Sequence, residues 1–403
     1  MTVSKNKTLF CSSRVAGLQL SGTVSINAEV VRMIAQGDKV LNFTVGEPFF
    51  REPEAVRQAL VQRLTTKKNG YSMPGGSLVL REAVSTKLRR ENNTEYNTDE
   101  IVCGIGAKQM ILHALMSLVG EGDEVLLPAP FWPSHQAQIS LCGAKAVTFP
   151  FLGQNLLSDL RSLAGAISEK TKVLILTNPH NPAGYCLGSD TLKSIVKLCG
   201  DQKIWIICDE IYEYYTYDCQ HYSLSFVAPE ARESIVIVSG LSKSFAMTGY
   251  RVGYLAADLS LTEQVLKLQS HSTTCLPPFI EEAACVALNG GKALVTIYLE
   301  QINENRLLAI NILKGVRNLR FLEPNGAFYL FLDLRDWLGR GRSIASSEQF
   351  CKSLLYEKFV ALVPGEAFGC AGYARLNYGV EREVLNRGLS ELVEFMEQGN
   401  DST

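Results

Sequence analysis

The sequence predicts an α/β fold in which helices cover a mostly parallel central sheet and a second, smaller domain follows. The chain has 403 residues, 46% of them hydrophobic, so it can bury a large core, and its length favours two domains over one. The middle of the chain alternates short apolar runs with helical patterns, which is typical of a parallel sheet covered by helices. From about residue 291 onward, long amphipathic helices surround an apparent strand, GAFYLFLDL, which indicates the second domain.

Four apolar runs in the middle of the chain are expected to be buried strands, because each is short and ends in polar or turn residues. They are 122–130, 172–179, 203–210 and 234–240. Between the second and third runs, DTLKSIVKLCGDQ has helical spacing, with Ser189 or Asp190 as the expected N-cap. Ligands of open parallel sheets bind at the carboxyl ends of the strands, so the residues just after these runs are the first candidates for chemistry.

The charge and the cysteine pattern argue against several classes of protein. A formal net charge of −2 gives no electrostatic reason to expect nucleic acid or an anionic membrane as a partner. The 11 cysteines are scattered singly, so neither a metal site nor a disulfide framework is predicted, and reduced thiols in the cytoplasm are expected. The N-terminal residues lack a signal-peptide pattern, and no apolar run is long enough to span a membrane.

The segment SGLSKSFAMTGYRVGY, residues 239–254, places Lys243 just past the last expected strand and Arg251 eight residues later. A desolvated ammonium is costly, and a Schiff base to the aldehyde of pyridoxal 5'-phosphate (PLP) would remove that cost. Arg251 could then bind the cofactor phosphate, with a serine contact from Ser239 or Ser242, since Gly240 has no hydroxyl. The alternative is an ordinary solvated loop lysine.

Polar residues also follow the two preceding strands. Asp209 ends one of them, where its carboxylate could pair with a protonated pyridine nitrogen and keep the ring an electron sink. Alternatively, Asp209 and Glu210 simply begin the next helix, where they favour its dipole. Tyr212, and Asn181 in the proline-flanked turn TNPHNPAG, could both reach the phenolic oxygen of the cofactor ring.

A phosphate cup and a stacking face are expected nearby. GIGAKQ follows an apparent strand and opens a helix, so the backbone amides of Ala107 and Lys108 could meet the phosphate. A dinucleotide site is not supported, because the third glycine of its fingerprint is missing. In PAPFWPSH, Trp132 could stack on the ring and His135 could support the strand-end carboxylate, although Trp132 could equally be an ordinary core residue.

Eight motifs in a fixed order then support one family over nearly the whole chain: GEPFF, NGYSMPGG, GAKQ, FWPSH, TNPHNPAG, DEIY, SKSFAMTGYR and ARLNYG. This set resembles the class I aminotransferases of PLP fold type I. The resemblance implies a large PLP-binding domain at 50–290, with a mostly parallel sheet. It also implies a smaller α+β domain formed by 1–49 and 291–403.

The resemblance also implies roles for the matching residues near the cofactor. Lys243 would be the Schiff-base lysine and proton shuttle, Asp209 the partner of the pyridine nitrogen, and Asn181 and Tyr212 the contacts of the ring oxygen. The phosphate would be held by Ala107, Lys108, Ser242 and Arg251. Tyr71 would reach the phosphate of the opposite subunit, which implies an obligate homodimer.

For the substrates, amino acids and 2-oxo acids, the resemblance implies a second set of contacts. Taken alone, Arg375 would be expected to be an exposed strand arginine. The resemblance implies instead that it clamps the α-carboxylate, since an arginine fork suits a carboxylate. Trp132, Asn181 and the backbone of Gly46 would complete that end of the site.

The resemblance extends to bacterial aspartate transaminases, some of which also use prephenate or aromatic acids. Lys108 and Thr23 match residues that read a distal carboxylate in that subgroup, which implies a dicarboxylic substrate such as aspartate. Two departures leave aromatic or neutral amino acids open: Phe49 replaces an acidic residue of the GEPDF motif, and Gln19 stands where relatives often have a basic residue. A PLP-dependent β-lyase and a non-enzymatic effector-binding module also remain as alternatives.

Overall fold

The central feature of the fold is a seven-stranded sheet. The computed structural model describes residues 12–18, 22–153, 156–339 and 344–400. Six strands of the sheet run in the same direction, and β8 runs antiparallel to both of its neighbours. The strand order is β2 (Ile101–Ile105), β8 (Val252–Ala256), β7 (Ile235–Gly240), β6 (Trp205–Asp209), β5 (Thr171–Thr177), β3 (Glu124–Ala129) and β4 (Lys145–Pro150). The four predicted strands are therefore confirmed as β3, β5, β6 and β7.

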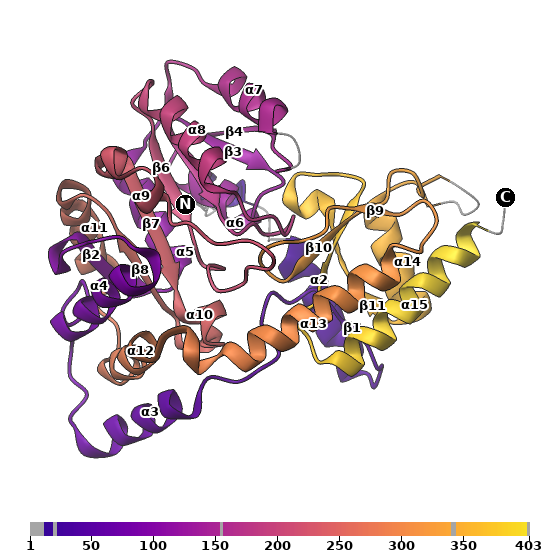
Figure 1. Cartoon of the computed structure of the whole chain (residues 1–403), viewed down its shortest axis with the longest axis horizontal. Helices are drawn as coiled ribbons and strands as arrows, with labels where there is room; N and C mark the ends of the chain where they lie inside the picture. The colour runs from indigo at the N-terminus through magenta and orange to yellow at the C-terminus, as the bar shows by residue number, and fades with distance from the viewer. Residues whose placement is uncertain (1–11, 19–21, 154–155, 340–343, 401–403) are drawn as a thin grey trace, which may run out of the picture.

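Helices cover both faces of this sheet (Figure 1). In β5, Val173 and Ile175 pack into the cluster that includes α5 and α11, whereas Leu174 and Leu176 pack into the cluster that includes α4, α8 and α12. Burial on both faces explains why the strands read as continuous apolar runs. The helices of this part are α3 (Glu54–Thr66), α4 (Leu78–Asn92), α5 (Ala107–Leu118), α6 (Pro133–Leu141), α7 (Leu156–Ala166), α8 (Ser189–Gly200), α9 (Leu224–Val227), α10 (Leu241–Ser244), α11 (Leu259–Ser272) and α12 (Pro278–Gly290).

Two of the local expectations for this part were wrong. Helix α8 has Gly188, in an extended conformation, at its N-cap, so Ser189 and Asp190 lie inside its first turn and cap nothing. There Asp190 still favours the positive end of the helix dipole. No helix starts at Asp209 or Glu210 either, because the chain forms a turn over residues 211–214.

The second part contains two small sheets. One is antiparallel, in the order β12 (Val363–Pro364), β13 (Tyr373–Asn377), β10 (Tyr329–Asp333) and β9 (Arg320–Phe321), and the other pairs β1 (Leu41–Asn42) with β11 (Val360–Ala361) in parallel. The accompanying helices are α1 (Ser13–Ala16), α2 (Gly22–Ala35), α13 (Thr296–Leu313), α14 (Ser347–Lys358) and α15 (Arg382–Asn400). Helix α13 runs from the neighbourhood of α12 to the small sheets (Figure 1).

Residues from the two ends of the chain pack together in this second part. Val30 and Met33 of α2 share a hydrophobic cluster with Leu355 of α14 and Ala361 of β11. The pairing of β1 with β11 joins the same two segments through backbone hydrogen bonds. The predicted domain boundaries, after residues 49 and 290, stay predictions.

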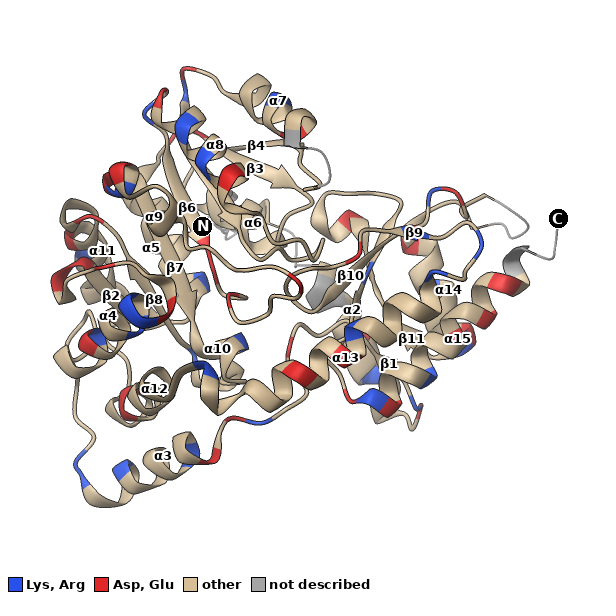
Figure 2. Cartoon of the chain, viewed as in Figure 1, with Lys and Arg blue, Asp and Glu red and all other residues tan. Residues whose placement is uncertain are grey.

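Charges are distributed without strong segregation. Figure 2 shows that basic and acidic residues are interspersed over the outer helices of both parts. Among the described helices, none combines the length and the apolar character that crossing a membrane requires.

Candidate active site

A cavity of about 370 Å³ lies where the carboxyl ends of β5, β6 and β7 meet the small antiparallel sheet. Its position fits the rule that ligands of open parallel sheets bind beyond the strand ends. Ten of the predicted site residues line it: Gly46, Ala107, Lys108, Trp132, Asn181, Asp209, Tyr212, Ser242, Lys243 and Arg251.

Lys243 lies on the one-turn helix α10, which begins directly after β7. Its Nζ donates a hydrogen bond of 2.7 Å to the carbonyl oxygen of Gly46, and its own carbonyl accepts one of 2.7 Å from the Tyr215 hydroxyl. Burial lowers the pKa of Lys243 to about 8, with a further lowering from the positive charge of Arg251. The side chain is thus not the solvated loop lysine of the alternative interpretation, and a larger fraction of it is neutral and nucleophilic near neutral pH than of an ordinary lysine.

Asp209 is the last residue of β6 and points into the cavity. Its Oδ1 accepts a hydrogen bond of 3.2 Å from the backbone N–H of Ile211. Its Oδ2 lies 3.6 Å from Nε2 of the buried His135, too far for a direct hydrogen bond. That ring nitrogen has no hydrogen-bond partner among the described residues, and a small approach of the two side chains would let it donate to the carboxylate.

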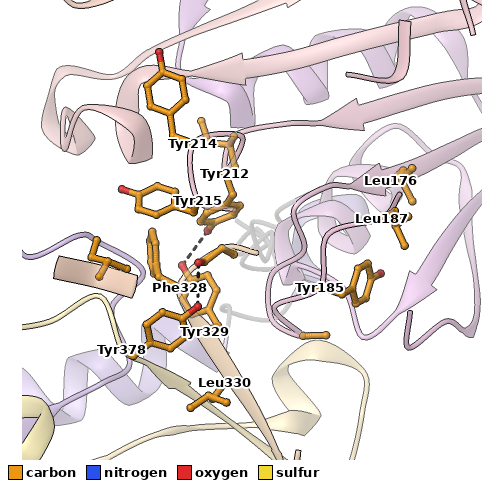
Figure 3. Close-up of a cluster of buried hydrophobic side chains, with 14 of the residues drawn as sticks. Leu176, Tyr185, Leu187, Tyr212, Tyr214, Tyr215, Phe328, Tyr329, Leu330 and Tyr378 are labelled. Carbon is orange, nitrogen blue, oxygen red and sulfur yellow. Dashed lines mark hydrogen bonds between the residues drawn. The ribbon is translucent and has the colours of Figure 1, made fainter. Parts of the chain in front are cut away.

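A chain of hydrogen bonds crosses from the large sheet to the small one. The Asn181 amide donates to the Tyr212 hydroxyl at 3.0 Å, and the hydroxyls of Tyr212 and Tyr329 lie 2.9 Å apart (Figure 3). Arg375 donates to the Asn181 carbonyl oxygen at 3.0 Å, which fixes the orientation of that amide. Burial raises the pKa of Tyr212 well above its ordinary value, so this hydroxyl is a protonated donor.

Positive charge collects at the end of the cavity formed by α5. A Cβ placed on Gly106 would lie 2.6 Å from Nη2 of Arg251, so the glycine lets the guanidinium approach the start of the helix. Lys108 lines the same end of the cavity, and both burial and the charge of Arg251 lower its pKa. The backbone N–H of Ala107 lies at the helix N-terminus and therefore has no hydrogen-bond partner within the helix. This donor and the two neighbouring cations together favour the binding of an anion the size of a phosphate.

Arg375 occupies the middle of β13, opposite Phe331 of β10, and is fully buried. The alternative of an exposed strand arginine is therefore wrong. One terminal nitrogen donates to Asn181, and the other donates to the carbonyl oxygen of Thr44 at 2.6 Å. Within the described residues Nε has no partner, so this guanidinium keeps donor capacity for an anionic ligand.

Some predicted residues lie elsewhere or cannot be placed. Tyr71 does not line the cavity, and 92% of its surface is exposed in this single chain. Thr23 belongs to α2, but its side chain lies outside the described residues, as does the whole of Gln19. Ser239 is turned away, because its hydroxyl donates to Glu213, so Ser242 is the serine that faces the cavity.

The departure at Phe49 leaves the Gly46 loop in contact with the cavity. The Phe49 ring packs edge-on against Phe50 and Tyr298, at centroid distances of 5.9 and 6.4 Å. Gly46 still presents its carbonyl to Lys243.

Tyr329 is the residue that sequence reasoning missed. It lines the cavity, its ring lies 4.5 Å from the Arg375 guanidinium, and its hydroxyl bonds to Tyr212. It stands inside GAFYLFLDL, where an aromatic residue is what any buried strand would contain, so no local signal marks it.

The arrangement fits PLP. An anion-binding end, an acid at the opposite strand end and a lysine of lowered pKa share one cavity with the indole of Trp132. Because Gly106 and Gly253 have no Cβ, the Arg251 guanidinium and the backbone of β8 can both approach the start of α5 closely. The residues present therefore match the phosphate, the pyridine ring and the aldehyde of that cofactor.

The comparisons with known proteins show the family of the chain. The family model "Aminotransferase class I and II" matches residues 38–392. The chain is 33% identical to the aspartate aminotransferase of Thermotoga maritima, over 96% of this chain and 99% of that protein. It is 32% identical to a probable aspartate/prephenate aminotransferase of Aquifex aeolicus, over 96% of this chain and 98% of the relative.

Solved structures show the same architecture. The aspartate aminotransferase of Rhizobium meliloti superimposes with a TM-score of 0.92 at 29% identity, covering 97% of this chain and all of the other. The Thermus thermophilus aspartate aminotransferase with maleate gives 0.89 at 29% identity, over 96% and 100% of the two chains. The chain therefore belongs to the class I and II aminotransferases, PLP-dependent enzymes of fold type I that move amino groups between amino acids and 2-oxo acids.

Proposed function

We propose that the enzyme is an aspartate aminotransferase that transfers the amino group of aspartate, or of a related dicarboxylic amino acid, to a 2-oxo acid such as 2-oxoglutarate. The observation that carries this proposal is the meeting of Lys243, Asp209 and Asn181 around one cavity, with Arg375 bonded to Asn181. The relatives named aspartate aminotransferase support the choice of donor. A ping-pong cycle follows, because one site handles donor and acceptor in turn.

Bound PLP supplies an aldehyde that takes up the amino group and a ring that withdraws electrons from the substrate Cα. Lys243 holds the cofactor between turnovers and then carries a proton from Cα, a role that its lowered pKa suits. Asp209 keeps a proton on the pyridine nitrogen, and His135 supports that carboxylate. Asn181 and Tyr212 donate hydrogen bonds to the ring oxygen.

The phosphate and the subunit arrangement belong to the same proposal. Ala107, Lys108, Ser242 and Arg251 hold the phosphate. Tyr71 is exposed in the single chain and therefore available to the phosphate site of a second copy, so the active form is a homodimer. Residues 50–290 form the PLP-binding domain, and 1–49 with 291–403 form the smaller domain. A cytoplasmic location stays a prediction.

Substrate carboxylates are read at two ends of the cavity. Arg375 and Asn181 bind the α-carboxylate with the backbone of Gly46, and Trp132 closes that side. Lys108 and Thr23 read the distal carboxylate. Prephenate is the second acceptor to be considered, because several relatives are named aspartate/prephenate aminotransferases.

A substrate panel tests the assignment. Purified enzyme with PLP is assayed with aspartate, glutamate, phenylalanine and leucine as donors to 2-oxoglutarate, and with prephenate as an acceptor. We expect the highest kcat/KM with aspartate. Lys108→Met, assayed with saturating PLP because Lys108 also holds the phosphate, is expected to lower the value for aspartate more than the value for phenylalanine. A preference for phenylalanine would contradict the dicarboxylic assignment, and release of ammonia from a cysteine conjugate without an oxo acid would indicate a β-lyase instead.

A further inference from the structure

Two cysteines outside the substrate cavity lie side by side. Cys186 belongs to the loop between β5 and α8, and Cys219 belongs to the segment between β6 and α9. The Cys186 sulfur lies 4.0 Å from the carbonyl oxygen of Gln220, the residue next to Cys219. The fold therefore brings together two thiols that are 33 positions apart in the sequence.

Asn325 holds both cysteines in place. Its side-chain oxygen accepts a hydrogen bond of 2.6 Å from the backbone N–H of Cys186. Its backbone oxygen accepts one of 3.1 Å from the Cys219 thiol. Because one residue anchors both partners, their separation does not depend on two independently moving loops.

The two thiols differ in exposure and acidity. Cys219 is partly exposed, whereas Cys186 is buried. The neighbouring Cys186 thiol lowers the pKa of Cys219 to about 7, and His221 acts in the same direction, while burial and Asp218 oppose it. The neighbouring Cys219 thiol and burial, together with the charge of Glu210, raise the pKa of Cys186.

An accessible, acidic thiol beside a buried one is the arrangement of a redox-sensitive pair, because the thiolate reacts first and its neighbour resolves the product. We propose that Cys186 and Cys219 form a reversible disulfide, a modification site that is independent of the substrate cavity. A peroxide oxidises the Cys219 thiolate to a sulfenic acid and releases hydroxide. The Cys186 thiol then attacks that sulfur, forming the S–S bond and releasing water. A dithiol reductant restores both thiols by exchange.

The disulfide has a defined structural consequence. Cys186 lies in the same loop as Asn181, and Cys219 lies in the segment that follows Tyr212, so the bond ties together two elements that contribute to the cavity. Neither cysteine lines the cavity itself.

Mass spectrometry of the oxidised holoenzyme tests the proposal. The PLP-loaded enzyme is treated with hydrogen peroxide, remaining thiols are alkylated, and the protein is digested with trypsin without reduction. Cleavage after lysine and arginine places Cys186 on peptide 173–193 and Cys219 on peptide 204–232. We expect these peptides to be linked through Cys186 and Cys219, and dithiothreitol to separate them.

Variants locate the bond. The second peptide also contains Cys208, so Cys208→Ala is the matched control and should keep the link, whereas Cys186→Ser should lose it. A link through Cys208, or oxidation of Cys219 to sulfinic acid with no link in the wild-type protein, would overturn the proposal.

A second measurement does not require oxidation. The rate of alkylation of Cys219 by iodoacetamide should rise with pH around a midpoint of about 7. In Cys186→Ser, the midpoint should move up toward the ordinary cysteine value of about 8.5. An unchanged midpoint in that variant would show that Cys186 does not activate Cys219, and the assigned pairing would fail.

Discussion

The large and small sheets contribute to the cavity in different ways. On the large sheet the functional residues stand at or just past strand ends: Asp209 closes β6 and Lys243 follows β7. On the small sheet they stand within strands, because Arg375 is central in β13 and Tyr329 begins β10. The cavity is thus formed by the strand ends of the large sheet, which we call its rim, and by one face of the small sheet.

This difference has a physical consequence. Parallel strands end at a common edge, so topology alone brings their following residues together. A charged side chain in the middle of a buried strand must instead have its partners built around it, as Asn181 and Thr44 are around Arg375. We therefore expect changes at the rim to affect the chemical step and changes on the small sheet to affect substrate recognition.

The largest expected effect is at the rim. Lys243→Ala removes both the cofactor linkage and the group that carries the proton, so we expect transamination to fall by at least about 10⁴-fold. The measurement is single-turnover conversion of aspartate, followed through the absorbance of bound PLP. Lys145→Ala is the control, since that side chain is 73% exposed and should leave the rate unchanged. Near-normal turnover in Lys243→Ala would contradict the expectation that residues at the rim carry out the chemical step.

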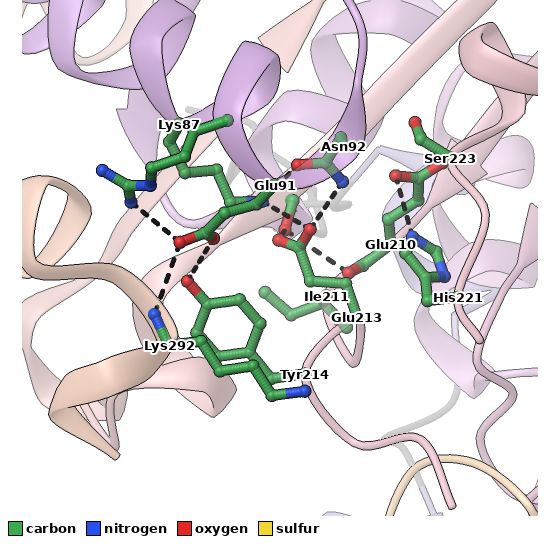
Figure 4. A network of polar contacts seen from close by, with 12 residues as sticks. Lys87, Glu91, Asn92, Glu210, Ile211, Glu213, Tyr214, His221, Ser223 and Lys292 are labelled. Carbon is green, nitrogen blue, oxygen red and sulfur yellow. Dashed lines mark hydrogen bonds and ion pairs between the residues drawn. The ribbon is translucent and has the colours of Figure 1, made fainter. Parts of the chain in front are cut away.

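A buried ion pair behind the rim should affect stability rather than chemistry. Lys87 and Glu213 form this pair on the far side of the turn that carries Tyr212, and the Asn92 amide donates to the same carboxylate at 2.8 Å (Figure 4). Lys87→Met leaves that carboxylate buried without its cation, so we expect the free energy of unfolding to fall by about 3–5 kcal/mol.

The double variant Lys87→Met with Glu213→Leu tests whether the loss of stability comes from the unpaired carboxylate. It should recover most of the lost unfolding free energy, because it replaces the Glu213 carboxylate as well as its cation. Lys314→Met, which breaks an exposed pair with Glu323, should cost no more than about 1 kcal/mol. Denaturant unfolding measures the free energy of unfolding of these three variants. If Lys87→Met lowers the free energy of unfolding only slightly, the turn that carries Tyr212 does not depend on the Lys87–Glu213 ion pair.

The same contrast explains what could be predicted from the sequence. Runs such as 203–210 predict strands, and Asp209 is a candidate for chemistry simply because it ends one. For Arg375 the residues alone favour an exposed strand arginine, and only the resemblance to the family indicated otherwise. Its burial depends on partners about 194 and 331 positions away, which no local pattern reports. The place of Tyr329 in the site could not be predicted for the same reason.

On the small sheet, Arg375→Lys tests recognition. Lysine keeps the charge but loses the planar fork, and a charged hydrogen bond contributes about 1.5–3 kcal/mol, so kcat/KM for aspartate should fall by roughly 10-fold to 150-fold, mainly through KM. Arg335→Lys, in the turn that follows β10 and 61% exposed, is the matched control and should change little. A fall in kcat with an unchanged KM would contradict the expectation that changes on the small sheet affect substrate recognition rather than the chemical step.

The smallest expected effect is a pH dependence that distinguishes Lys243 from Arg375. In the cofactor-free enzyme the pKa of Lys243 is about 8, below its unfolded value of about 10.4. Below pH 8 both states are protonated and the cost of burying the ammonium is fully present. Between these values only the unfolded chain holds the proton, so the free energy of unfolding should rise with pH, by at most about 1.4 kcal/mol per unit.

Comparison with Lys243→Met isolates this contribution from other groups that titrate in the same range. The difference in unfolding free energy between wild type and this variant, measured in urea from pH 8 to pH 10, should grow as the pH rises. The matched difference for Arg375→Met should stay flat, because a guanidinium remains protonated throughout. Parallel profiles for wild type and Lys243→Met would show that the lysine at the rim is no more easily deprotonated than an exposed one, and its proposed role as a proton carrier would lose its physical basis.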